Sequence, residues 1–95
     1  MLFCVHALDR PNALQDRLSH FEDHQKFLAD TSAFSVQIVM SGPLITDHGE
    51  QMIGSLFVVE APNRTAVERF NAADPYHGAG IWERITITGF LKRRG

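Results

Sequence analysis

The sequence predicts an α+β domain in which strands and helices follow one another in the order β-α-β-β-α-β. Three observations lead to this prediction. Short apolar runs of the kind found in strands open and close the chain and occur twice in its middle. Two segments with a helical spacing of apolar residues lie between the first and second runs and between the third and fourth. Proline and glycine interrupt the chain between these segments.

Length and composition are those of one small domain. The chain has 95 residues, 44% of them hydrophobic and 21% charged, and we expect a single domain over residues 1–95. A formal net charge of -2 gives no electrostatic reason to expect a nucleic acid as partner. No apolar run is long enough to cross a membrane, and the first residues lack the features of a secretion signal.

Cys4 is the only cysteine, so the chain cannot form an internal disulfide. This favours a reducing compartment, and the cytoplasm is the expected location. Because Cys4 lies inside an apolar run, we expect a buried small hydrophobic residue there rather than a nucleophile.

The first strand and the first helix are predicted from the N-terminal third of the chain. Residues 2–8 are apolar on both alternating faces, as in a central strand. The helix is expected to begin near residue 14 and to run to about residue 29 or 33. Its apolar stripe consists of Leu14, Leu18, Phe21 and Leu28, and the charged residues, Arg17 among them, are expected mostly on the other faces.

Two further strands are predicted in the middle of the chain. Residues 36–40 should form the second strand, ended by the motif Ser41-Gly42-Pro43. The third strand is expected over residues 52–60, where Gly54 indicates a bulge or a close approach of another backbone.

The second helix and the last strand complete the order. The helix is capped by Asn63 or Thr65 and should end near Ala73. Residues 83–91 alternate between apolar and polar side chains, which predicts the fourth strand. Right-handed crossovers then give a four-stranded antiparallel sheet with both helices on one face, the ferredoxin-like arrangement.

The strands carry apolar residues on both faces, although the two helices cover only one. The other face would therefore expose an apolar patch of a size that monomers rarely tolerate. We expect a second copy of the chain to pack there, sheet on sheet, in a two-fold homodimer.

The loop that starts at Asp74 is the strongest candidate for a functional site. Pro75 pushes Asp74 out of the helical region, so the carboxylate should end the second helix and be free to face a partner. Tyr76, His77 and two glycines follow within six residues. An acidic, an aromatic and a basic side chain on such a loop are more typical of a site than of a connection.

His24 is the expected partner of Asp74. It lies three residues after Phe21 and four before Leu28, on the stripe that should be buried. A buried imidazole needs a hydrogen-bond partner, and a carboxylate would orient it. A purely structural role for His24 remains open at this point.

Other kinds of site are less well supported by the sequence. His20 and His24 have the spacing of two metal ligands on a helix, but the zincin motif is absent and we expect no metal. No nucleophile elbow and no glycine-rich phosphate loop occur, and we expect no cofactor. Backbone N–H groups at Ser41 and Gly42 could line a pocket, although such a motif is more often only a turn.

Four motifs occur in register along nearly the whole chain. They are the opening strand with Asp9-Arg10, Arg17-Leu18-Ser19 with His24 and Leu28, Ser41-Gly42-Pro43-Leu44, and Asp74-Pro75-Tyr76 with Ala79-Gly80-Ile81 and Arg84-Ile85. In these motifs the chain resembles the YCII-related family of small YciI-like proteins. The resemblance implies a ferredoxin-like fold, a homodimer, and an active site of one histidine and one aspartate, which fall on His24 and Asp74.

The resemblance also guides the expected function. One activity associated with the wider family is dehydrochlorination of a chlorinated hydroxyquinol ring, and related dimers include muconolactone-isomerase-like proteins and cofactor-free monooxygenases. We therefore expect cofactor-free elimination or isomerisation of a small cyclic or unsaturated substrate by His24 and Asp74, with Ser41, Gly42 and Tyr76 binding the substrate. The alternative is a non-catalytic metabolite-binding or interaction module in which the pair is structural.

Overall fold

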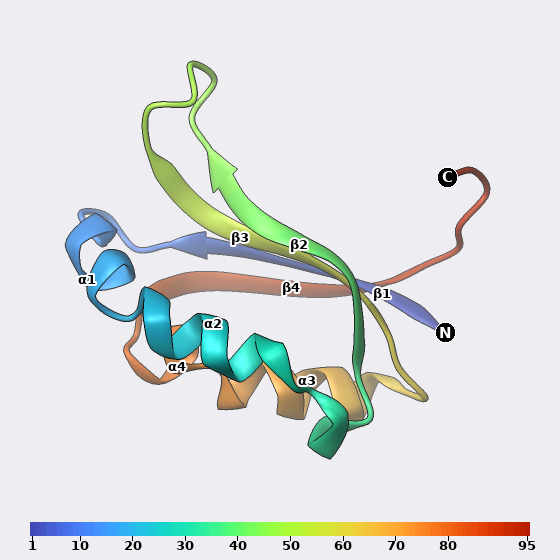
Figure 1. The fold of residues 1–95 in the computed structure, drawn as a ribbon. Helices are drawn as coiled ribbons and strands as arrows, with labels where there is room; N and C mark the ends of the chain where they lie inside the picture. The colour runs from blue at the N-terminus through green and yellow to red at the C-terminus, as the bar shows by residue number, and fades with distance from the viewer.

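In the computed structural model, which describes residues 1–95, four antiparallel strands form one sheet in the order β2-β3-β1-β4. The strands span Leu2–Asp9 (β1), Gln37–Ile45 (β2), Met52–Glu60 (β3) and Trp82–Phe90 (β4). All helices lie on one side of this sheet, while the β2–β3 hairpin projects away from them (Figure 1). The ferredoxin-like α+β fold is thus confirmed.

The helical layer contains more pieces than the sequence predicts. The helices are α1 (Leu14–Ser19), α2 (Phe21–Ala29), α3 (Arg64–Ala73) and α4 (Pro75–Gly78), with a 3-10 turn, η1 (Ser32–Phe34), before β2. None of them has the length and the apolar character that a membrane-spanning helix needs. Helix α3 is capped by the Asn63 side chain, which accepts a hydrogen bond from the Ala66 N–H at 2.9 Å.

The prediction of one continuous first helix is wrong at His20. The chain leaves helical geometry there, which separates α1 from α2. The Ser19 hydroxyl and the His20 ring both bond the Asp16 carbonyl, and such local side-chain bonds compete with helical backbone bonds. The side chains buried on the two helices are Arg17 and His24, whereas Leu18 and Phe21 are each 49% exposed.

The prediction that the second strand ends at Ser41 is also wrong. Strand β2 continues through Ser41, Gly42 and Pro43 to Ile45. A proline is tolerated there because β2 is an edge strand, so its outer side has no ladder hydrogen bond to lose. The motif therefore presents a strand surface, instead of a turn, to the space under the helices.

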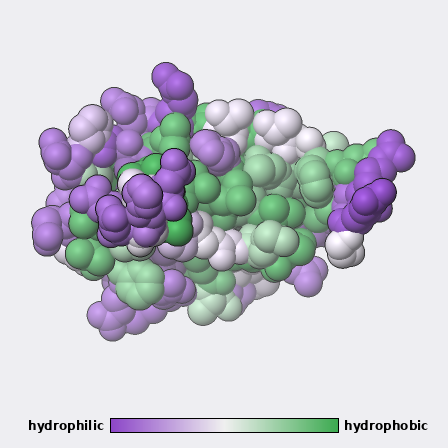
Figure 2. Space-filling model, turned by 90° about the horizontal axis from the view of Figure 1, so that it is seen from above, coloured by the Kyte–Doolittle hydropathy of each residue, from purple (hydrophilic) through white to green (hydrophobic).

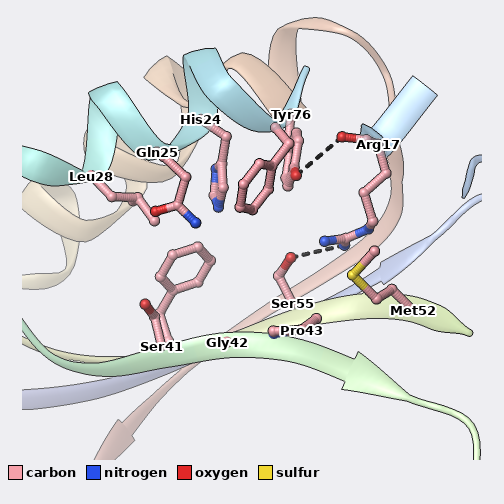
Figure 3. A pocket seen from close by; sticks show the side chains of 12 residues that line it. Arg17, His24, Gln25, Leu28, Ser41, Gly42, Pro43, Met52, Ser55 and Tyr76 are labelled. Carbon is pink, nitrogen blue, oxygen red and sulfur yellow. Dashed lines mark hydrogen bonds between the residues drawn. The ribbon is translucent and has the colours of Figure 1, made fainter. Parts of the chain in front are cut away.

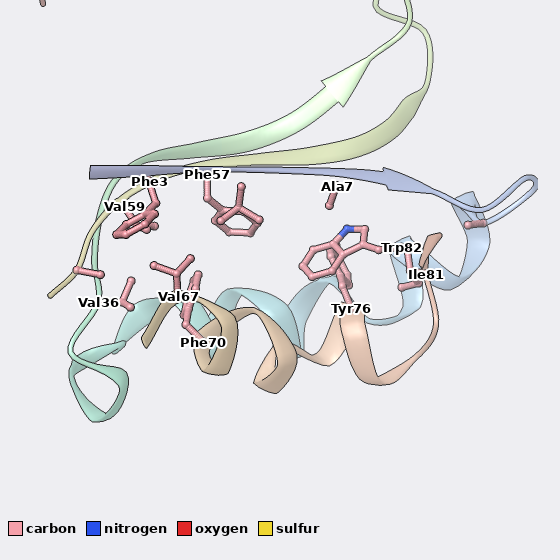
Figure 4. Packing of buried hydrophobic residues seen from close by; sticks show 13 residues of the cluster. Phe3, Ala7, Val36, Phe57, Val59, Val67, Phe70, Tyr76, Ile81 and Trp82 are labelled. Carbon is pink, nitrogen blue, oxygen red and sulfur yellow. The ribbon is translucent and has the colours of Figure 1, made fainter. Parts of the chain in front are cut away.

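The hydrophobic core lies between the sheet and the helices (Figure 4). Alternate residues of β1 point into it, as the period of two requires. Phe57 on β3 packs edge-on against both Phe70 on α3 and Trp82 on β4. This aromatic contact joins the sheet to the helical layer.

The open face of the sheet carries many apolar side chains (Figure 2). Cys4, Leu56 and Val58 are only half-buried there, and Val39 on the edge strand is 53% exposed. The expectation that Cys4 is buried is therefore not met within one chain, because its side chain belongs to the face that no helix covers.

At Gly54 on β3 the neighbouring strands leave no room for a side chain. A Cβ atom at Gly54 would lie 2.4 Å from the Ala7 carbonyl oxygen and 2.9 Å from Leu44 Cδ1. The predicted close approach is therefore confirmed, and only glycine fits without movement of the backbone.

We expect Gly54→Ala to lower the free energy of unfolding by about 1–3 kcal/mol, because the new methyl group overpacks the sheet. Gly42→Ala is the matched control, since a Cβ at this other strand glycine would meet no atom within 4 Å. Urea denaturation of both variants measures the effect. Equal stability of the two variants would contradict the steric explanation.

Candidate active site

A cavity of about 250 Å³ opens between α1 and α2 on one side and strands β2 and β3 on the other (Figure 3). Its wall combines apolar and polar side chains. The apolar ones are Phe21, Leu28, Pro43, Met52 and Phe57, and the polar ones are Arg17, His24, Gln25, Ser41, Ser55 and Tyr76. Because a closed apolar cavity of roughly 150 Å³ takes up benzene, this space suits one substituted six-membered ring.

His24 and Asp74 form a buried hydrogen-bonded pair. His24 Nδ1 lies 2.9 Å from Asp74 Oδ1, and the same oxygen accepts the Tyr76 backbone N–H at 2.8 Å. An ionised carboxylate only accepts hydrogen bonds, so Nδ1 carries the hydrogen in this pair. His24 Nε2 has no hydrogen-bond partner in the protein, and it is not one of the side-chain atoms that are buried without a partner. Its lone pair is therefore available to the cavity that His24 lines.

Asp74 supports this site from behind the cavity wall. Its backbone is extended, with φ -65° and ψ 134°, because Pro75 follows it. The side chain is 1% exposed and does not line the cavity. Asp74 Oδ2 is buried without a partner, so the carboxylate makes its side-chain bond to His24 alone.

Tyr76 lies directly against His24. The two rings stack with centroids 3.9 Å apart and planes 9° from parallel. The Tyr76 hydroxyl donates to the Arg17 backbone carbonyl at 3.2 Å. The cavity therefore meets the face or edge of the Tyr76 ring, while the hydroxyl that was expected to bind substrate is held by the backbone.

A second buried pair lies at the other end of the cavity and was not predicted from the sequence. Arg17 donates to both carboxylate oxygens of Asp9, through Nε and Nη2, at 2.8 Å each. Arg17 Nη2 also donates to the Ser55 hydroxyl at 2.9 Å. A signal for it did exist: Arg17 precedes His24 by seven residues, about two helical turns, which places both side chains on one face.

The remaining predicted residues separate into two groups. Ser41 and Gly42 line the cavity from β2, together with the stacked Tyr76 ring. His20 is outside it, with Nδ1 bonded to the Asp16 carbonyl at 2.9 Å. No group of three or more histidine, cysteine, aspartate or glutamate side chains is arranged to hold a metal ion.

Comparison with known proteins identifies the family to which the chain belongs. A model of the YCII-related domain matches residues 1–91. The chain belongs to the YCII-related family. Its relatives include an uncharacterized protein of Haemophilus influenzae, 29% identical over 97 residues, and protein YciI of Escherichia coli, 28% identical over 100 residues. Each match covers 97% of this chain and 98% of the relative.

Solved structures agree with this assignment to the YCII-related family. The 5-chloro-2-hydroxyhydroquinone dehydrochlorinase of Burkholderia phenoliruptrix, in complex with 2,5-dihydroxybenzoquinone, matches with a TM-score of 0.84 and 29% identity. The match covers 96% of this chain and 94% of that one. A protein of Arabidopsis thaliana, at 13% identity and a TM-score of 0.53, shows the fold alone.

The pH dependence of Tyr76 follows from its burial. Burial raises the pKa of the phenol above its ordinary value of 10.0; the Arg17 charge opposes this shift and the Asp74 charge adds to it. The unfolded chain therefore loses this proton at a lower pH than the folded chain does. The resulting stability is fully present below pH 10.0 and is lost as the pH rises through the folded-state pKa.

Tyr76 is the only tyrosine, so tyrosinate absorbance reports on it directly. We expect the folded protein to form tyrosinate only above the pH at which the urea-unfolded chain does. In Tyr76→Phe, the part of the alkaline loss of stability that comes from this phenol should disappear, as measured by denaturation at stepped pH. Coincident titration of folded and unfolded protein would contradict the burial of the phenol.

Proposed function

We propose that this YCII-related protein is an enzyme that removes a proton from a small ring substrate, with His24 as the acid/base group and Asp74 as its orienting partner. The observation that carries the proposal is the hydrogen bond between buried His24 and Asp74 at the wall of a cavity with room for one ring. The similarity to a dehydrochlorinase over nearly the whole chain supports elimination as the reaction type.

The proposed reaction begins at His24 Nε2. This atom takes a proton from the substrate, and Asp74 stabilises the imidazolium that forms. The electron pair of the broken bond moves into the substrate. In an elimination a group such as chloride then leaves with its own bonding pair, and in an isomerisation His24 returns the proton to a different carbon.

The walls of the cavity would hold the substrate during these steps. Phe57 offers a flat apolar surface, the Tyr76 ring stacked on His24 adds apolar wall, and Ser41 and Gly42 would contact the substrate from β2. Loss of a proton next to an electron-withdrawing group, followed by loss of a leaving group, requires neither a redox cofactor nor a second substrate. The proposal therefore includes no cofactor.

A second candidate is a binding module that holds a ring compound without converting it. The observation that favours it is the burial of His24, which is only 7% exposed. In that case the pair with Asp74 would be a structural hydrogen bond. Protein that binds 2,5-dihydroxybenzoquinone but releases no chloride from the chlorinated ring would support this candidate over the enzyme.

The first prediction of the enzyme hypothesis concerns His24. We expect His24→Ala to reduce chloride release from 5-chloro-2-hydroxyhydroquinone by about 10²–10⁴-fold, because the acid/base group is lost. His20→Ala is the matched control, since it removes an imidazole one turn earlier that lies outside the cavity. Equal turnover in His24→Ala and His20→Ala would end the assignment.

We further propose that the protein acts as a homodimer in which the open sheet faces pack together. The support is the uncovered face of the sheet. Cys4, Leu56 and Val58 remain partly exposed there because no other part of the chain lies over them. Burying this apolar patch against a second copy would remove it from water.

We expect sedimentation equilibrium at micromolar concentration to give a dimer. Val58→Lys should give a monomer, because a charge would be buried in the proposed interface. Leu18→Lys places the same charge on α1, on the helical side of the molecule, and should leave the dimer intact. A wild-type monomer, or a dimer that Val58→Lys does not weaken, would remove this proposal.

A further inference from the structure

We infer that Arg17 and Ser55 form an oxyanion-binding site in the cavity, and that the ring substrate is bound as an enolate or phenolate. This inference names the substrate class and so rests on the proposed function. Figure 3 shows the Arg17 guanidinium and the Ser55 hydroxyl side by side at the Met52 end of the cavity, while His24 lies toward Gln25 and Leu28.

The hydrogen bonds of Arg17 leave one nitrogen free. The single Nε hydrogen and one Nη2 hydrogen are donated to Asp9, and the other Nη2 hydrogen is donated to Ser55. Both hydrogens of Nη1 then have no acceptor in the protein. Two buried side-chain atoms lack a hydrogen-bond partner, Asn71 Nδ2 and Asp74 Oδ2. Arg17 Nη1 also lacks a protein partner but is not one of these buried atoms, so it is reached by solvent.

The Ser55 hydroxyl also has a donor hydrogen without an acceptor in the protein. Its oxygen accepts from Arg17 Nη2 at 2.9 Å and from Trp82 Nε1 at 3.4 Å. These two bonds use the oxygen as an acceptor, and no protein atom accepts the hydroxyl hydrogen. Because Ser55 lines the cavity, that hydrogen is available to a ligand there.

Arg17 is held in this position before any ligand binds. Its side chain is 4% exposed, its two-bond contact with Asp9 fixes the plane of the guanidinium, and its central carbon lies 4.8 Å from the centre of the Tyr76 ring. Asp9 balances the charge of Arg17, so the attraction for an anion comes from directed N–H groups rather than from a net positive charge. Such fixed donors bind an oxyanion with little loss of conformational entropy.

The donor arrangement selects among ring compounds. Three hydrogens without acceptors, two on Arg17 Nη1 and one on Ser55, favour a ligand oxygen that accepts several hydrogen bonds. An enolate or phenolate oxygen meets this requirement and a methyl ether does not. The same oxygen would carry the negative charge that develops when His24 removes a proton from the ring.

The inference can be tested by binding, without turnover. Cyclohexane-1,3-dione is an enolate at neutral pH, and its methyl ether, 3-methoxycyclohex-2-enone, is a neutral ring of similar shape. We expect calorimetric titration of the wild-type protein to show at least about tenfold tighter binding of the enolate, as charged hydrogen bonds imply. Absence of this preference, or of any binding of the enolate, would overturn the inference.

Two variants locate the preference. The double variant Arg17→Met with Asp9→Asn removes the pair together, so no buried charge is left alone, and should bring the affinity ratio close to one. Ser55→Ala should lower the ratio severalfold. The double variant Arg10→Met with Asp16→Asn is the control, because it removes another Arg–Asp pair, at the surface outside the cavity, and should leave the ratio unchanged.

The other possible outcomes also support or overturn the inference. A folded Arg17→Met, Asp9→Asn protein with the wild-type ratio would overturn the inference. If that variant does not fold, the Arg17 side-chain N–H signals of the wild-type protein should shift in NMR spectra on addition of the dione, and unmoved signals would overturn it. The proposed catalytic role fails separately, through unchanged turnover in His24→Ala.

Discussion

The carboxylate of Asp74 is the group on which the candidate site depends. Its Oδ1 atom accepts two hydrogen bonds, one from His24 on α2 and one from the backbone N–H of Tyr76 at the start of α4. The two helices are far apart in sequence, and this shared acceptor fixes one relative to the other. The stacking of Tyr76 on His24 follows from the same contact, because the Tyr76 N–H and the imidazole converge on one atom.

Hydrogen-bonded polar pairs occupy positions where the first helical segment could have buried leucine or phenylalanine. Arg17 and His24 point inward and pair with Asp9 and Asp74, while Phe21 is half exposed. Well-packed apolar side chains are often as stabilising as a buried ion pair, and removing one partner of such a pair costs roughly 3–5 kcal/mol. Stability alone therefore gives little reason for this arrangement, whereas a cavity that must bind and deprotonate a polar ring does.

The order of the strands, the side covered by helices and the proximity of His24 to Asp74 could be foreseen from local patterns: a period of two, a period near 3.6, and a proline that ends a helix. The role of Arg17 was missed, although its spacing from His24 carried a signal, because a charged residue is assigned to solvent unless its partner is known. Asp9 becomes that partner only through the packing of α1 across the end of β1. The length of β2 was missed for a similar reason, since Pro43 ends a strand unless the strand lies at an edge.

Trp82 gives the cavity an optical reporter of its own. It is the only tryptophan of the chain, its indole N–H donates to the Ser55 hydroxyl at 3.4 Å, and its ring lies edge-on to Tyr76 with centroids 5.9 Å apart. Indole emission responds to the hydrogen bonding and polarity around the ring. Occupancy of the cavity in the unmodified protein can therefore be followed by fluorescence, without a label and without knowledge of the natural ligand.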